Sequence, residues 1–163
     1  MKLKTKILMG TAALALVGIA FATPILKLTI PILAMGTHNN PMSATGDYPV
    51  DGGYFKVALT TNRPASVVTQ LGAFNVGGEN GWHSHPGMVA VTLTAGQIAW
   101  YDENCHETIY SAGDTWFEGS QIHMFKNIGQ TNVQLTAVFI VSQGAPLRLD
   151  QSAPACATAL GLN

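Results

Sequence analysis

The chain has 163 residues, of which 47% are hydrophobic and only 10% are charged, and its formal net charge is −1. This length provides for a single domain with one hydrophobic core. Eight basic residues against nine acidic ones exclude the basic surface that nucleic-acid binding requires. We therefore expect a small molecule or a metal ion as partner, and no nucleic acid.

Residues 1–22 have the layout of a secretory signal peptide. Lysines at positions 2, 4 and 6 precede an uncharged stretch that ends at Leu26, and Ala20-Phe21-Ala22 provides small residues at the spacing of a cleavage site. Cleavage after Ala22 would place the protein in the periplasm or outside the cell, with a net charge of about −4. The alternative is an uncleaved anchor in the inner membrane, since about twenty uncharged residues can cross a bilayer. A membrane is a partner only in that case.

From Lys27 onward the sequence is typical of an all-β domain. Short β-branched runs are separated by glycine and asparagine, and no long segment has apolar residues at the 3.6-residue spacing of a helix. Nine short strands in one domain favour a sandwich or a barrel, which we place at residues 28–150. The segment 36–53 is rich in asparagine, proline and glycine, and we expect it to be a loose connection rather than a lid. The predicted strands are 27–34, 54–59, 66–74, 88–93, 97–101, 108–110, 115–117, 123–127 and 133–141.

Three histidines are candidate metal ligands. His83 and His85 are two residues apart, so in an extended strand both side chains point to the same face. His123 lies about forty residues later, in the predicted strand 123–127. Three imidazoles on one interior face can bind a transition metal ion. His38 and His106 lie in predicted loops, where we expect ordinary surface residues.

The two histidine segments resemble the motifs of the cupin family. Gly81-Trp82-His83-Ser84-His85-Pro86-Gly87 is similar to the first cupin motif, G-x5-H-x-H-x3-4-E-x6-G, and Gly113-Asp114, His123 and Asn127 match part of the second, G-x5-P-x-G-x2-H-x3-N. The resemblance extends over about residues 28–156 and is strongest to small exported single-domain bacterial cupins. It implies a double-stranded β-helix, or jelly-roll, barrel with the metal bound by His83, His85 and His123.

The sequence departs from the cupin pattern at the metal-binding glutamate. Counting from His85 places this ligand at Val89, and Gly96 follows at the expected distance. Glu79 and Glu118 are the nearby carboxylates that could replace it, but each lies in a predicted loop, where we expect a solvated side chain. If Val89 faces the metal, Val89→Glu would restore the carboxylate and tighten metal binding. The residue types do not distinguish Zn, Fe, Cu, Ni and Mn.

The two cysteines are expected to form a disulfide. Cys105 follows the turn at residues 102–104, and Cys156 lies in the tail formed by residues 151–163. In an exported protein such a pair would be oxidised and would tie the tail to the barrel. Two unrelated thiols are the alternative.

Three functions remain open on this sequence. The strand parity places Val89, Val91 and Phe125 inside the barrel, which predicts an apolar pocket beside the metal. We expect a module that binds a metal and a small ligand without turnover, because no general base is evident. The alternatives are a metal-dependent enzyme, similar to a dioxygenase or an isomerase, that acts on a small anionic substrate, and a structural barrel without metal. A homodimer is compatible with each of them.

Overall fold

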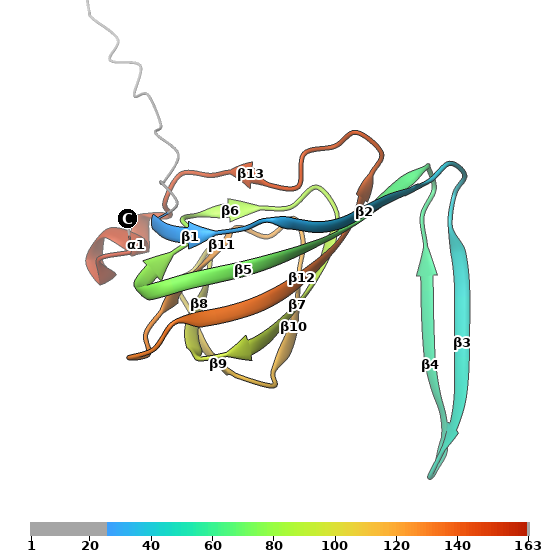
Figure 1. The fold of residues 1–163 in the computed structure, drawn as a ribbon, viewed down its shortest axis with the longest axis horizontal. Helices are drawn as coiled ribbons and strands as arrows, with labels where there is room; N and C mark the ends of the chain where they lie inside the picture. Colours follow the sequence, from blue (N-terminus) through green and yellow to red (C-terminus); the bar gives the residue numbers. More distant parts are fainter. Residues whose placement is uncertain (1–25, 163) are drawn as a thin grey trace, which may run out of the picture.

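The computed structural model describes residues 26–162, and most of them form one curled antiparallel sheet (Figure 1). The expected signal segment, residues 1–22, lies outside the described residues. The sheet has eleven strands, and every pair is antiparallel. Its strands are β1 (Leu26–Thr29), β2 (Ile32–His38), β5 (Ala65–Glu79), β6 (His83–Ser84), β7 (Met88–Ala95), β8 (Gln97–Asp102), β9 (Glu107–Ser111), β10 (Thr115–Glu118), β11 (His123–Asn127), β12 (Val133–Ser142) and β13 (Leu149–Asp150).

The strand order closes the sheet around a common interior. One side runs β10-β7-β12-β5, and the other side contains β11 with β8, β9, β6 and β13. The long strand β5 joins the two sides, because it pairs with β12 along ten positions and with β11 at Lys126 opposite Glu79. This arrangement confirms the expected all-β barrel of the double-stranded β-helix type.

Alternation of buried and exposed residues along the strands builds the core. In β12 every second residue from Val133 to Val141 is buried, as the two-residue period of a strand requires. Val89, Val91 and Leu93 of β7 are buried in the same way, which confirms the predicted parity of this strand. They belong to one interior cluster with residues from β5, β8, β10, β11 and β12.

Two differences from the predicted strands have local causes. The single strand expected at residues 27–34 is divided into β1 and β2, because Pro31 has no backbone N–H to donate to the sheet. Strands β6 and β13 were not predicted. Each has two residues, and they pair with each other at Leu149 opposite Ser84 and Asp150 opposite His83.

The segment 36–53 is not a loose connection, so this expectation is wrong. Its second half forms β3 (Ser43–Val50), which pairs with β4 (Gly53–Thr60) in a separate two-stranded sheet. The turn between them is made by Asp51 and Gly52, and the positive φ of Gly52, 85°, suits a hairpin turn. The hairpin projects away from the barrel (Figure 1).

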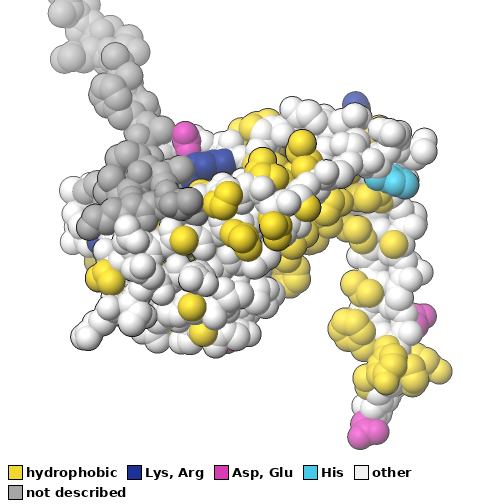
Figure 2. Space-filling model, in the orientation of Figure 1, with side chains coloured by type: hydrophobic (Ala, Val, Ile, Leu, Met, Phe, Trp, Pro, Cys, Tyr) yellow, Lys and Arg dark blue, Asp and Glu magenta, His cyan; other side chains and the backbone are white. Residues whose placement is uncertain are grey.

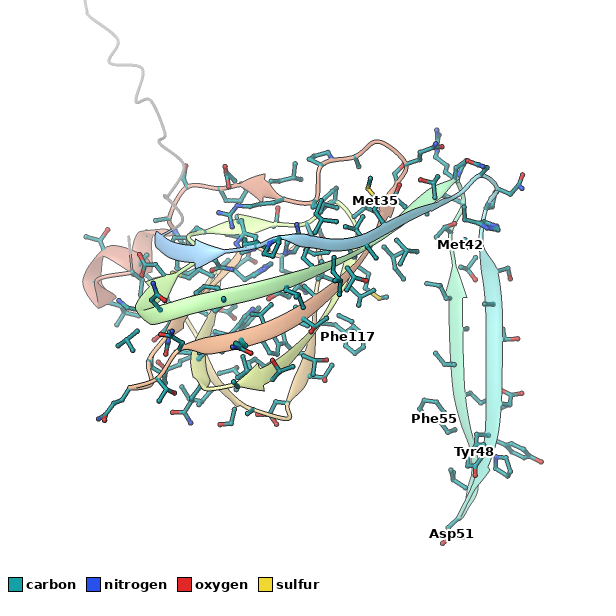
Figure 3. All side chains as sticks on the ribbon, in the orientation of Figure 1. Met35, Met42, Tyr48, Asp51, Phe55 and Phe117 are labelled. Atoms are coloured by element: carbon teal, nitrogen blue, oxygen red, sulfur yellow. A yellow bond between two sulfur atoms is a disulfide. The ribbon has the colours of Figure 1, made fainter. Side chains whose placement is uncertain are left out.

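The hairpin exposes large apolar side chains. Tyr48 is 68% exposed and Phe55 is 61% exposed, and Val50, Tyr54 and Val57 are also exposed. Figure 2 shows these apolar atoms gathered over the outer half of the hairpin, and Figure 3 shows Tyr48 and Phe55 near its tip. A two-stranded hairpin is at best marginally stable alone in water, so this one lacks the packing that would normally stabilise it.

A disulfide ties the C-terminal tail to the barrel, as expected. Cys105 follows β8, and Cys156 lies in the short helix α1 (Ala155–Leu160). The tail packs against Trp82, whose indole donates a hydrogen bond of 2.6 Å to the carbonyl of Leu162. Among residues 26–162, no helix is long and apolar enough to cross a membrane.

Removal of this disulfide should lower the stability of the barrel. Cys105→Ser/Cys156→Ser opens a loop with a sequence separation of 51 residues, which in the chain-entropy account reduces the free energy of unfolding by about 4 kcal/mol. Urea denaturation with and without reductant measures the effect. Reductant should shift the midpoint of the native protein and leave that of the double variant unchanged. Equal midpoints for the two proteins would contradict the prediction.

Candidate metal centre

Four buried side chains converge inside the barrel. They are His83, His85, Glu118 and His123, and one potential ligand atom from each lies within 4.8 Å of all the others. The structure therefore brings the three predicted histidines together and adds a carboxylate to them.

Backbone pairing explains why the histidines meet. His83 in β6 is the direct cross-strand partner of His123 in β11, and their ring centroids are 4.4 Å apart. His85 follows β6 and lies edge-on to His83 at 4.8 Å. The backbone N–H of His85 also donates a hydrogen bond of 2.8 Å to the carbonyl of Gly119. This bond places His85 beside the end of β10.

A glycine allows the histidine segment to lie close to the opposite strand. A Cβ atom at Gly87 would lie 2.2 Å from the carbonyl oxygen of Ile140 in β12. Real Cβ atoms do not come this close to a backbone oxygen, so any side chain here would push the segment away from β12. Gly87 thus helps to determine where His85 lies.

Each histidine is oriented by a backbone carbonyl. The Nδ1 atoms of His83, His85 and His123 lie 2.8, 2.7 and 2.9 Å from the carbonyl oxygens of residues 81, 147 and 121. A carbonyl oxygen can only accept a hydrogen bond, so Nδ1 carries the proton in all three rings. In the neutral ring Nε2 then presents a lone pair, which is the arrangement of a histidine that binds metal.

Two tryptophans orient the carboxylate of Glu118. The indole N–H groups of Trp100 and Trp116 donate hydrogen bonds of 3.1 and 2.8 Å to its Oε1. The other oxygen, Oε2, lies 3.2 Å from Nε2 of His85 and 3.3 Å from Nε2 of His123. Oε1 is therefore fixed by the two indoles, and Oε2 faces the histidines.

The charge states of these groups favour a bound cation. Burial, together with the charges of His123 and Arg148, lowers the pKa of His83 to about 2, so this ring is neutral. Burial alone would raise the pKa of Glu118, but its contacts with His123, His85 and Trp116 hold that pKa well below its usual range. The ring of His83 is therefore neutral, and the carboxylate of Glu118 that lies beside the histidines is ionised.

The donor set fits a divalent metal ion. A carboxylate oxygen and a neutral Nε2 are both acceptors, so a proton or a cation must lie between them. Nε2 of His123 is buried and makes no hydrogen bond within the described part of the chain. Three imidazole nitrogens and one carboxylate oxygen are suitable ligands for Zn, Fe, Cu, Ni or Mn, and they do not select one of these metals.

The expectation that Glu79 and Glu118 are solvated is wrong for both residues. Glu118 is 6% exposed and Glu79 is 7% exposed. Glu79 lies outside the cluster and pairs with Lys126 at 3.6 Å. Glu118 in β10 lies directly opposite Val89 in β7. Val89 occupies the position where the cupin motif has its glutamate, so the carboxylate reaches the cluster from the neighbouring strand.

Three other residues have simple structural roles. His38 and His106 are exposed, as expected, although His38 is the last residue of β2 and not a loop residue. His106 bonds to Asp102. Asn127 lies in the second motif but is not part of the donor cluster. Its amide bonds to the backbone of residues 74, 75, 129 and 131 and holds a turn.

Three members of the cluster, His83, His85 and Glu118, line a cavity of about 260 Å³. Most of the lining is apolar, and Val89, Val91 and Phe125 contribute to it as the strand parity predicts. Outside the donor set, Gln70, Asn80 and Arg148 are the polar side chains that line it. The cavity combines an apolar surface with a few converging polar groups, as small-ligand sites do.

Comparisons with known proteins agree with this architecture. Residues 70–139 match the family model described as Cupin domain. A search of curated proteins gives no match.

The solved structures that match this chain are distant from it in sequence. A conserved double-stranded β-helix protein from Klebsiella pneumoniae is 22% identical, with 69% of this chain and 86% of that chain covered and a TM-score of 0.47. A predicted oxalate decarboxylase from Thermotoga maritima is 19% identical, with 63% and 92% covered and a TM-score of 0.41. The cupin domain of Schizosaccharomyces pombe Cnp3 is 9% identical, with 64% and 86% covered and a TM-score of 0.43.

The register of β7 and β10 changes the expectation for Val89→Glu. Since Val89 is fully buried opposite Glu118, this substitution alone should place two carboxylates side by side and destabilise the fold rather than tighten metal binding. Glu118→Gln should weaken zinc binding at least tenfold, by analogy with the loss of supporting metal-site groups. The exchange Val89→Glu/Glu118→Val should recover part of that affinity, because the carboxylate returns on the facing strand.

Zinc titration of the three variants checks this prediction, and thermal melting shows which of them fold. A folded exchange variant that binds zinc no better than Glu118→Gln would show that the two facing positions are not equivalent.

Proposed function

Because the barrel of this chain belongs to the cupin superfamily, we propose that the protein binds one divalent transition metal ion together with a small ligand in its interior cavity. His83, His85, Glu118 and His123 would hold the ion. The observation that carries this proposal is the orientation of the three imidazoles, each fixed through Nδ1 by a backbone carbonyl. A barrel that used these histidines only for packing would not need three rings fixed in this way around one buried carboxylate.

The residues around the cluster would determine what the metal does. When bound, the ion supplies Lewis-acid polarisation of a ligand oxygen. Glu118 would reduce the net charge of a divalent centre from +2 to +1, and most of the cavity wall around it is apolar. Of the described residues that line the cavity, none outside the donor set carries a carboxylate or an imidazole. Within residues 26–162 the cavity wall thus offers no separate general base, which favours binding or sensing over turnover.

Export is part of the same proposal. A disulfide between Cys105 and Cys156 is compatible with an oxidising compartment. Together with the signal-like pattern of residues 1–22, it supports a periplasmic or secreted location.

We also propose that the protein is a homodimer held by its hairpin. The apolar outer half of β3 and β4 needs a partner surface, and the barrel itself has exposed apolar residues on the side from which the hairpin projects. Met35 is 69% exposed and Phe117 is 66% exposed there (Figure 3). In a dimer with a two-fold axis, the hairpin of each copy could pack against the barrel of the other copy. The symmetry would then form the same hairpin-to-barrel contact two times.

Alanine substitution of the histidines tests the metal centre. His83→Ala, His85→Ala and His123→Ala should each abolish stoichiometric zinc, because each removes one Nε2 ligand. His38→Ala and His106→Ala are matched controls on the surface and should retain zinc at one per chain. Metal analysis of purified, zinc-equilibrated proteins gives the answer. Full zinc content in the His85→Ala protein would refute the proposed centre.

Substitutions on the hairpin test the homodimer. Tyr48→Ser/Phe55→Ser should convert a dimer into a monomer, since exposed aromatic residues often dominate the energy of an interface. Ile109→Ser, at an exposed apolar position of β9, should leave the dimer intact. Light scattering during size exclusion reports the mass. A native protein that stays monomeric at its highest soluble concentration would refute the dimer, and binding of that monomer to lipid vesicles would assign the hairpin to a membrane surface instead.

A further inference from the structure

One cationic side chain in the cavity wall, Arg148, is not among the candidate metal ligands. Arg148 lies between Leu147, whose carbonyl accepts the hydrogen bond from His85, and β13, which pairs with β6 at His83 and Ser84. The backbone on both sides of Arg148 is therefore fixed against the segment that contains two of the histidines. Its side chain lines the same cavity as His83, His85 and Glu118.

The guanidinium of Arg148 is only partly neutralised. Its Nε pairs with the carboxylate of Asp150, a residue that is largely exposed. Its Nη2 is buried and has no hydrogen-bond partner among the described residues. A guanidinium keeps its charge at any ordinary pH, so Nη2 remains a charged donor although it is buried. A buried donor of a charged group that is left without an acceptor is costly, and a bound anion would remove that cost.

The rest of the cavity restricts what the anion can be. Apart from the donor set, Arg148, Gln70 and Asn80, its lining is apolar. An inorganic anion would place unpaired charge next to these apolar walls, which is unfavourable. The ligand should therefore have one charged end and an apolar body. A volume of about 260 Å³ corresponds to roughly eight or nine water molecules at ~30 Å³ each. That limits the ligand to a small molecule.

We propose that Arg148 and the metal centre together form a subsite for the carboxylate of a small organic acid whose remainder is apolar. The inference deepens the proposed function and rests on it for the metal. The carboxylate would accept a charge-assisted hydrogen bond from Nη2 of Arg148 at one oxygen, while the net positive charge of the metal centre attracts it from the other side. The apolar remainder would lie along Val89, Val91 and Phe125.

Benzoate and its neutral analogue benzamide are suitable probes. Calorimetric titration of the zinc-loaded protein should show benzoate binding at least tenfold more tightly than benzamide. Arg148→Met should reduce the affinity for benzoate by about tenfold to a hundredfold, the range expected for a hydrogen bond to a charged group. Arg148→Lys keeps the charge without the planar fork and should give an intermediate loss, which also serves if the methionine variant does not fold.

Two controls separate this subsite from general effects of charge and from the metal. Arg63→Met removes the same charge from an exposed loop and should not change benzoate binding. Zinc content should be the same in the Arg148 variants and the native protein, because Arg148 is not a ligand. Acetate should bind more weakly than benzoate, since it lacks the apolar body.

The outcomes distinguish the two proposals. Equal affinity for benzoate in the native and Arg148→Met proteins would overturn the carboxylate subsite, and so would the absence of any benzoate binding to a zinc-loaded protein, while the metal centre would stand. A protein that takes up no zinc but binds benzoate in a way that depends on Arg148 would refute the metal centre and retain the subsite.

Discussion

Three hydrogen bonds to backbone carbonyls determine the chemistry of this barrel interior. Carbonyl oxygens of residues 81, 121 and 147 accept the Nδ1 protons of the histidines, and this fixes the orientation of each ring and the position of its Nε2 atom. The acceptors come from three different segments of the chain. The centre therefore exists only when the segment before β6, the loop before β11 and the segment before β13 are all in place.

The C-terminal tail packs against the residue that precedes the first histidine. Trp82 immediately precedes His83 and is fully buried in a second apolar cluster with Met124, Ala157 and Leu162. Its carbonyl accepts a hydrogen bond of 3.0 Å from the backbone of Gln151. Since the disulfide keeps the tail against this cluster, the stability of the tail and the position of the first histidine depend on the same packing.

Much of the fold and part of the centre could be predicted from the sequence. Strand parity placed His83, His85 and His123 on the interior with Val89 and Phe125, because a two-residue period leaves little freedom once one face is buried. The hairpin could not be predicted in this way. All of β3 is exposed, so no alternation marks it, and its Asp51-Gly52 turn was the available signal.

The role of Glu118 was missed through an error of one residue at a strand end. The predicted strand 115–117 ended just before it, so its side chain was assigned to a solvated loop. In β10, Trp116 and Glu118 share a face, and extension of the strand by one position would have turned the carboxylate inward. The contacts with Trp100 could not be foreseen, since they depend on how β8 and β10 approach across the barrel.

The position of Glu118 opposite Val89 also bears on how such motifs should be interpreted. A sequence pattern describes a ligand by its distance along one strand, whereas a metal ion responds only to where the oxygen atom is in space. Two residues that face each other on one rung of an antiparallel ladder offer their side chains to nearly the same point. A chain can therefore lose the written motif and keep the donor set. In barrels of this architecture, a search for metal ligands should therefore compare pairs of residues that face each other on neighbouring strands, and not single sequence positions.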